Sequence, residues 1–277
     1  MKRVSDALEV ARSNLIVQAR KPPGQRRRHF PQADAWLLER IRGLVHVRST
    51  YGYRRITAIL NRQLVAEGKS RVNHKRIYRI MRENDLLLQR HTGKPTRTHE
   101  GQVITLKSNL RWCSDTFEIR CWNDERVEVA FSLDCCDREA LGYVATCPKG
   151  ITSDMICDLM LRSAEHRFGP EIRSVPHLIE WLSDNGPCYT AHKTRKFAKL
   201  LGLEACTTPA YSPQSNGMAE AFVKTFKRDY VYVNSVESAQ DVMWQLPNWF
   251  EDYNENHPHK GLKMKSPRKF LRLNSVA

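Results

Sequence analysis

The sequence has 277 residues, 41% of them hydrophobic, which suits one sizeable core or two smaller ones and excludes a chain disordered throughout. Its apolar runs are too short and too often interrupted by charge to cross a bilayer, and no signal segment is recognisable, so we expect a cytoplasmic protein with no membrane partner. The formal charge of +15 indicates an anionic partner, and eight cysteines without CxxC spacing indicate free thiols.

The basic charge is concentrated in the N-terminal part of the chain. Residues 1–107 hold 24 of the 45 Lys and Arg but only 8 of the 30 Asp and Glu. A solvated basic face that serves only solubility is the alternative. Segregation on this scale nevertheless favours a nucleic acid.

The first third of the chain predicts a basic segment followed by a small all-α module. Residues 1–30 combine a possible amphipathic helix with the basic run Lys21–Arg28, a candidate flexible tether. Apolar positions at helical spacing then predict three short helices within residues 31–90, and Asn73 is a plausible N-cap for the third. The arrangement is compatible with a helix-turn-helix.

The third helix of this module is the candidate recognition helix. Lys75, Arg76 and Arg79 are expected on its exposed face, where they could contact phosphates or guanine edges. A plain helical bundle with a basic surface remains the alternative, because spacing alone does not reveal which groove is read. The polar, basic residues 91–107 are predicted to be an interdomain linker.

Residues 108–235 predict a mixed α/β sheet flanked by helices. Three strands are expected first, at 112–119, 127–133 and 141–147. Helices and strands then alternate, with helices at 153–164, 191–201 and 216–232 and strands at 177–182 and 203–207. The C-terminal residues 236–277 are expected to form a helical tail, in which Pro247 should kink or break a helix over 238–256.

Three carboxylates occupy suggestive places in this pattern. Asp115 lies within the first strand, Asp184 just past the fourth, and Glu220 in the first turns of a later helix. Carboxylates are the ligands that hard cations prefer, and two such cations can stabilise the attacking and leaving oxygens of a phosphodiester. In a chain with 30 acidic residues, however, placement alone is a weak signal.

The residues around these carboxylates resemble the DDE signature of the retroviral-integrase-like superfamily. The likeness is carried by Trp112–Asp115, Ser183–Gly186 and Tyr211–Glu220, with 35 residues between Asp184 and Glu220. The resemblance implies an RNase H-like fold. It also implies that Asp115, Asp184 and Glu220 are catalytic and bind two Mg²⁺ ions, for which Mn²⁺ can substitute.

Within the superfamily, the chain is most similar to the OrfB transposase subunit of bacterial insertion sequences with overlapping OrfA and OrfB frames. Tyr51–Ile56, Lys75–Met81 and Tyr253–His259 resemble its N-terminal module and C-terminal motif, and Leu133–Leu141 resembles the second-element subgroup. The resemblance implies cleavage and strand transfer at the element's terminal inverted repeats and integration into target DNA. It further implies an OrfA subunit or fusion as partner, a homo-oligomer on DNA, and a nucleoid-associated location.

Basic residues are assigned to DNA contact alongside the triad. The resemblance places Lys227 near the active site, with Lys224 as a second candidate on the same helix, and it adds Arg54 and Arg55 of the N-terminal module. A solvent-facing lysine on an amphipathic helix is the alternative for Lys227. Two further residues could touch substrate or act only in turn formation, Gln214 and Asn216.

Other conspicuous residues are left out of the site. Asp134 and Asp137 are expected to form a turn or pair with Arg138, and Trp112 is expected in the core. The ten histidines lack zinc-site spacing with cysteine, which argues against a structural zinc.

Two other functions remain open at this stage. One is a non-catalytic DNA-binding regulator of transposition, which would bind element ends without reacting. The other is a general RNase H-like nuclease, which would cut RNA–DNA hybrids without end specificity. The intact acidic triad argues against the regulator, although it does not exclude that role, and the basic N-terminal half and Lys227 favour a transposase over the nuclease.

Overall fold

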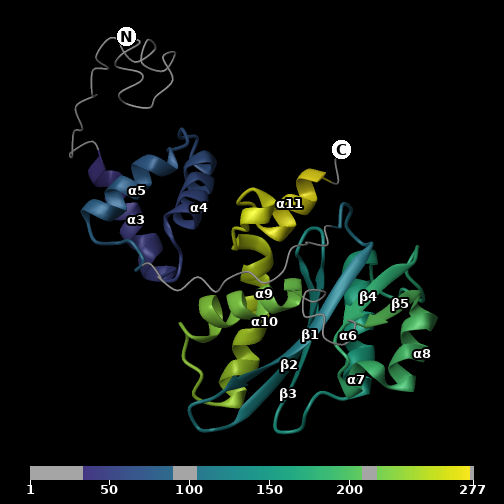
Figure 1. Ribbon diagram of the computed structural model, residues 1–277. Helices are drawn as coiled ribbons and strands as arrows, with labels where there is room; N and C mark the ends of the chain where they lie inside the picture. The colour runs from purple at the N-terminus through teal and green to yellow at the C-terminus, as the bar shows by residue number, and fades with distance from the viewer. Residues whose placement is uncertain (1–33, 90–104, 208–216, 275–277) are drawn as a thin grey trace, which may run out of the picture. The chain divides into compact units, whose positions relative to one another are not determined.

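A computed structural model describes residues 34–89, 105–207 and 217–274 (Figure 1). The helix and tether expected over residues 1–30, residues 90–104 of the linker region, and the loop with Gln214 and Asn216 lie outside the described residues. The chain divides into two units, Met1–Glu39 and Arg40–Ala277. No helix within the described ranges is long and apolar enough to span a membrane.

The N-terminal module contains the three predicted helices, α3 (Ala35–Val47), α4 (Tyr53–Ala66) and α5 (His74–Glu83). The predicted N-cap is confirmed, because Asn73 Oδ1 accepts a hydrogen bond from the backbone N–H of Lys75 at 2.9 Å. Helices α4 and α5 contact each other and bury their apolar faces. These buried residues are Ile56, Leu60 and Leu64 of α4 and Ile77, Ile80 and Met81 of α5.

A five-stranded mixed sheet forms the core, in the order β3-β2-β1-β4-β5. The strands are β1 (Arg111–Arg120), β2 (Arg126–Asp134), β3 (Ala140–Thr146), β4 (Ile179–Ser183) and β5 (Leu203–Thr207). The first three pair antiparallel, whereas β4 and β5 continue the sheet in parallel with β1. All five predicted strands are therefore present.

Helices cover both faces of the sheet, as Figure 1 shows. One face packs against α6 (Ser153–Phe168) and α8 (His192–Leu201), and Trp112 is fully buried there, as expected. The other face packs against α9 (Gly217–Phe226) and α10 (Ala239–Asn256). The alternation of β1 side chains thus places Cys113, Asp115 and Phe117 on the face that α9 and α10 cover.

Helix ends follow local sequence signals. Thr152 caps α6 with its hydroxyl oxygen, and Gly202 ends α8 in the left-handed region at φ 83°. A short helix not predicted from the sequence, α7 (Pro187–Thr190), follows β4. After α10 come a 3-10 turn, η4 (Lys260–Leu262), and α11 (Pro267–Asn274). All eight cysteines are free, as expected.

The predicted break at Pro247 is wrong. Helix α10 runs through this proline without interruption over 18 residues. A proline inside a helix costs about 3 kcal/mol, because one hydrogen bond is lost and its ring crowds the preceding turn. The face that α10 buries on the sheet, with Leu246 and Trp249 on either side of the proline and Phe250 beyond, offsets that cost. The tail expected over 236–277 therefore contains a helix, α10, that packs on the sheet as part of its core.

The helix predicted over 216–232 changes its winding midway. Helix α9 ends at Phe226, and a π-helical segment, η3 (Lys227–Val231), follows. Asp229 of this segment is buried and accepts hydrogen bonds from Thr50 Oγ1 at 2.7 Å and Arg55 Nη1 at 2.9 Å. The wider turn therefore directs a carboxylate toward the N-terminal module.

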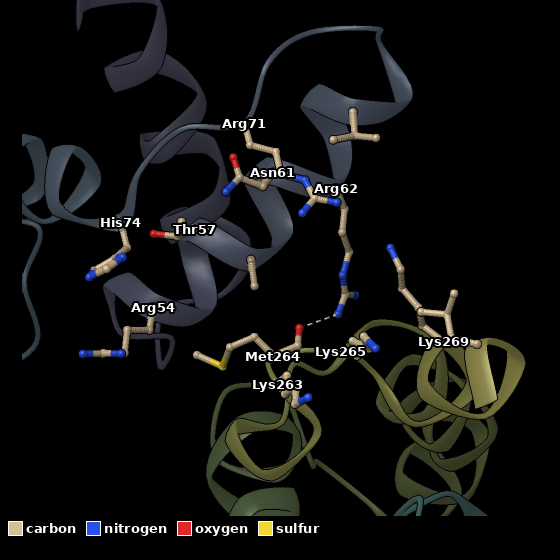
Figure 2. A pocket seen from close by; sticks show the side chains of 13 residues that line it. Arg54, Thr57, Asn61, Arg62, Arg71, His74, Lys263, Met264, Lys265 and Lys269 are labelled. Carbon is tan, nitrogen blue, oxygen red and sulfur yellow. Dashed lines mark hydrogen bonds between the residues drawn. The ribbon is translucent and has the colours of Figure 1, made fainter. Parts of the chain in front are cut away.

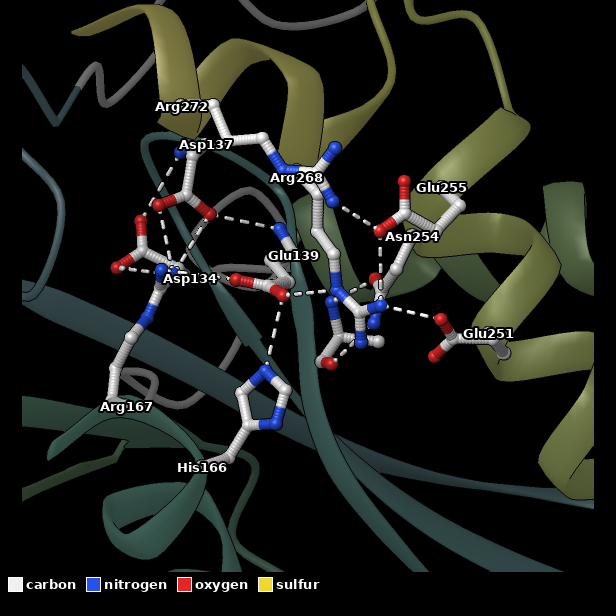
Figure 3. A network of polar contacts seen from close by, with 11 residues as sticks. Asp134, Asp137, Glu139, His166, Arg167, Glu251, Asn254, Glu255, Arg268 and Arg272 are labelled. Carbon is white, nitrogen blue, oxygen red and sulfur yellow. Dashed lines mark hydrogen bonds and ion pairs between the residues drawn. The ribbon is translucent and has the colours of Figure 1, made fainter. Parts of the chain in front are cut away.

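The turn between β2 and β3 is built on buried acids (Figure 3). Asp134 and Asp137 accept backbone N–H groups within the turn, as a turn former should. Of the two alternatives expected for these acids, turn formation is confirmed and pairing with Arg138 is not. The cation is Arg167 of α6, which contacts Asp137 at 2.8 Å and Glu139 at 3.0 Å. Sequence spacing could not reveal this partner, 30 residues away.

Candidate active site

Asp115 lies on β1 between two buried neighbours of the same face, Cys113 and Phe117. Its side chain is partly buried, and its Oδ1 accepts the backbone N–H of Thr116 at 2.8 Å. The strand is held firmly, because Ser114 Oγ lies 2.7 Å from the carbonyl oxygen of Phe131 on β2. Asp115 is therefore carried by a rigid, central strand of the sheet.

Asp184 follows the last residue of the neighbouring parallel strand. Cys113 pairs with Leu182, and the same register two residues further brings Asp115, in the middle of β1, level with Asp184, just past the end of β4. Asp184 Oδ1 accepts the backbone N–H of Gly186 at 3.0 Å, which closes a tight turn into α7. A Cβ on Gly186 would lie 3.0 Å from that same oxygen, which accounts for the glycine of the Ser-Asp-Asn-Gly segment.

A buried hydroxyl pair ties the two aspartate-bearing segments together. Tyr189 of α7 lies with its hydroxyl 2.8 Å from Ser114 Oγ, directly beside Asp115 on β1. The pair fixes the loop that carries Asp184 against the strand that carries Asp115. Sequence reasoning missed Tyr189, because no local pattern links it to a serine 75 residues earlier.

Glu220 is brought to the same face by the aromatic packing of α9. The ring of Phe222 lies 4.4 Å from that of Phe131, the β2 residue paired with Asp115, and Phe226 lies 5.6 Å from Phe117. The first turn of α9 is thereby held beside the strand position of Asp115. The Glu220 side chain is 46% exposed, and its Oε2 lies 3.4 Å from Lys224 Nζ.

The three carboxylates interact electrostatically. Burial is the largest cause that raises the pKa of Asp115 to about 6, and the negative charges of Asp184 and Glu220 raise it further. Carboxylate oxygens that repel one another in this way are a suitable donor set for a divalent cation. Among the described residues, however, no three His, Cys, Asp or Glu side chains gather tightly enough to hold an ion. Glu220 is turned toward Lys224, with its Oε2 3.4 Å from Lys224 Nζ, and rotation of its side chain could bring it toward the aspartates.

Replacing Asp115 with asparagine is expected to stabilise the metal-free protein. The folded-state pKa lies above the ordinary value of 3.8, so the ionised form is disfavoured on folding, and this cost appears as pH rises through about 4 to 6. Allowing for solvent screening, the free energy of unfolding should rise by about 1–2 kcal/mol at pH 7.5 and change little at pH 4. Urea denaturation at both pH values measures this. Equal destabilisation at both would contradict it.

The two lysines proposed for DNA contact flank the carboxylates differently. Lys224 is exposed and shares the Glu220 face of α9, as the helical spacing predicts. Lys227 is partly buried at the start of η3, with its Nζ 5.8 Å from the ring centre of Phe117. Since Phe117 is two residues from Asp115 on the same face of β1, Lys227 lies on the active-site face of the sheet.

The basic residues predicted on the module are not equivalent. Lys75 is exposed on α5, and Arg76 is partly exposed. Arg79 is also partly exposed and lies 3.9 Å from Glu83. On α4, Arg54 is exposed, whereas the Arg55 guanidinium is held by buried Asp229. Lys75 and Arg54 are therefore the most exposed of these basic side chains.

Comparisons with known proteins agree with this architecture. Residues 31–94 match the HTH-like domain family, and residues 106–213 and 201–267 match two Integrase core domain families. The chain is 47% identical over 275 residues to Transposase InsD for insertion element IS2A/D/F/H/I/K of Escherichia coli, covering 97% of this chain and 90% of that one. Among solved structures, the catalytic core domain of BIV integrase is 21% identical, with a TM-score of 0.41 over 61% of this chain and 97% of that one.

An HTH-like module followed by an integrase core defines a transposase of the polynucleotidyl transferase class. The predicted fold class, an RNase H-like mixed sheet preceded by a small all-α module, is confirmed. The chain belongs to the family of insertion-element transposases that includes InsD of IS2, which also confirms the predicted subgroup.

Proposed function

We propose that this transposase cleaves and joins DNA strands at the ends of its insertion element, with Asp115, Asp184 and Glu220 as the catalytic, metal-binding residues. The observation that carries the proposal is the electrostatic contact of these three carboxylates, supplied by two neighbouring parallel strands and a helix packed on them. The buried acid Asp137 is paired with Arg167, whereas Asp115 is held near other acids.

In this proposal the carboxylates hold two Mg²⁺ ions, which Mn²⁺ can replace. The ions supply charge neutralisation at the reacting phosphate and lower the pKa of the attacking hydroxyl. The chain's own residues do the rest. Asp115 and Asp184 stay fixed by β1 and the Tyr189–Ser114 contact, while Glu220 swings from Lys224 toward them. Lys227 places a positive charge on the same face, where it can contact a DNA phosphate.

The remaining basic residues divide between reading DNA and holding the fold. Residues 31–90 form the proposed DNA-binding module, in which Lys75, Arg76, Arg79 and Arg54 contact the terminal inverted repeats. Arg55 is proposed to anchor α4 to the core through Asp229 rather than to contact DNA. Residues 108–235 are the proposed catalytic core, joined to the module by a linker at 91–107, with 236–277 as its C-terminal extension.

The proposal includes partners beyond the single chain. Two element ends require two active sites, so a homo-oligomer on DNA is expected, together with an OrfA subunit or fusion that recognises the ends. Target DNA is the second nucleic-acid substrate. A protein bound to these DNAs would be associated with the nucleoid.

The test is strand cleavage and joining with the OrfA-fused protein on labelled duplexes that carry the terminal inverted repeats. We expect joined products with Mg²⁺ or Mn²⁺ and none with EDTA, whereas RNA–DNA hybrids should stay intact. Specific binding of the ends without joining in either metal would instead indicate a regulator. Cutting of hybrids without end specificity would indicate a general nuclease.

A further inference from the structure

A basic cleft lies away from the carboxylates, between α4 and the segment that leads into α11 (Figure 2). Its volume is about 430 Å³. Arg62 reaches across it from α4 and donates hydrogen bonds to the backbone carbonyls of Met264 at 3.2 Å and Asn256 at 3.0 Å. The basic side chains that line the cleft are Arg54, Arg62, Arg71, Lys263, Lys265 and Lys269.

The positive charge of this basic cleft is not matched by acids. No Asp or Glu is among the described residues that line it. Burial lowers the pKa of Lys269, and the positive charges of Arg62, Arg71 and Lys265 lower it further. By contrast, the partly buried Arg48 is paired with the carboxylate of Asp252. The cations of the basic cleft are therefore crowded together in a way that an anion would relieve.

The backbone at the cleft is also strained. Lys263 and Met264 are consecutive non-glycine residues in the left-handed region, at φ 52° and φ 62°. This region is disfavoured for a residue with a Cβ, because the Cβ crowds the following carbonyl oxygen. This conformation turns the Met264 carbonyl toward Arg62. Strain retained at a charged surface is typical of a site that serves binding.

The basic cleft adjoins the start of the candidate recognition helix. His74, the first residue of α5, lines it together with Arg71, three residues earlier. The N-terminus of a helix carries partial positive charge and favours phosphate. A duplex whose major groove received α5 would therefore bring phosphates of its backbone to this rim.

We propose that the basic cleft binds the sugar–phosphate backbone of the same element-end duplex that α5 reads. The inference rests on the proposed function, since it takes α5 as the end-reading helix. The C-terminal lysines 263, 265 and 269 would then position the module on the DNA, while α5 supplies the base contacts. Sequence reasoning missed this surface, because its two walls lie about 200 residues apart.

The test compares the triple variant Lys263→Gln/Lys265→Gln/Lys269→Gln with wild type in binding to the terminal inverted repeat over a range of salt concentrations. Arg62 is left in place because it holds two backbone carbonyls. We expect affinity to fall about tenfold or more near physiological salt, and the slope of log affinity against log salt to fall by about 2 to 3. Because like charges are removed, the thermal midpoint should not fall.

The matched control is Lys149→Gln/Lys196→Gln/Lys199→Gln, which removes the same charge from exposed positions outside the basic cleft. Its affinity should change by less than about threefold. Equal losses of DNA affinity in both triple variants would show that the loss depends only on the net charge of the protein, and would overturn the proposal. Unchanged DNA binding by the cleft variant would also overturn it. An acidic polypeptide would then be the remaining candidate ligand of the cleft.

Neutral methylphosphonate linkages identify which DNA occupies the basic cleft. Each linkage is placed singly in the element-end duplex, next to the bases that α5 is proposed to contact. At some positions the linkage should weaken DNA binding by the wild-type protein but not by the cleft variant, because the phosphate and the cleft lysines form an interacting pair. If the coupling appears only on target duplex, the proposal is wrong about the ligand. Joining by wild type tests the proposed function separately, so a wild type that joins normally while no phosphate couples to the lysines would sink only this inference.

Discussion

Replacing Glu220 with glutamine is expected to reduce strand joining at least about a thousandfold, since loss of one of the three proposed metal-binding carboxylates would remove several kcal/mol of transition-state stabilisation. The side chain is nearly half exposed, and its contact with Lys224 is a surface pair. Stability should therefore change by less than about 0.5 kcal/mol. The measurement is single-turnover joining with Mg²⁺, alongside DNA binding and thermal unfolding.

Glu204→Gln on β5 is the matched control, because Glu204 is an exposed acid on the edge strand. It should join strands at the wild-type rate. A second readout follows from the contact between the carboxylates, since removal of the Glu220 charge should lower the pKa of Asp115. Wild-type joining by the Glu220 variant would place the chemistry elsewhere and undo the assignment of the triad.

Sequence patterns predicted the elements well because each depends on nearby residues. The period of apolar positions predicted β1 through β5 and α3 through α5, and Asn73 marked the start of α5. Asp184 and Glu220 were singled out by the segments around them. Their convergence on Asp115 depends on strand register and on the packing of Phe222 on Phe131, which no local pattern contains.

The failures share one physical cause, which is that partners distant in sequence outweigh local preferences. Pro247 stays inside α10 because the sheet packs the flanking turns, and Arg167 replaces the adjacent Arg138 as the partner of Asp137. The departure of η3 from α-helical winding accompanies the burial of Asp229 against Thr50 and Arg55. Long-range contacts of this kind decide which local conformation is most stable, but they produce no periodic pattern in the sequence from which they could be predicted.

Arg167→Met is expected to cost about 3–5 kcal/mol of stability at neutral pH, because it leaves buried carboxylates without their cation. The Arg167 side chain is only 5% exposed and contacts Asp137 at 2.8 Å, Glu139 at 3.0 Å and Asp134 at 3.6 Å. In the variant, Glu139 would still accept hydrogen bonds from His166 and Arg268, which Figure 3 shows. The loss of stability should therefore come mainly from Asp134 and Asp137. Urea denaturation with circular dichroism measures the loss, and Arg120→Met, in an exposed ion pair with Asp124, should cost less than about 1 kcal/mol.

The loss in Arg167→Met should depend on pH with a definite sign. Burial raises the pKa of Asp134 to about 6, the charge of Asp137 raises it further, and Arg167 opposes both. Without Arg167 that pKa rises again, so the folded variant holds a proton that the unfolded chain releases. Its stability therefore falls as pH increases from about 5 to 8, and the deficit against wild type widens over this range. A deficit independent of pH would show that Arg167 acts through packing rather than through its charge, because a methionine of similar length preserves much of the side-chain volume.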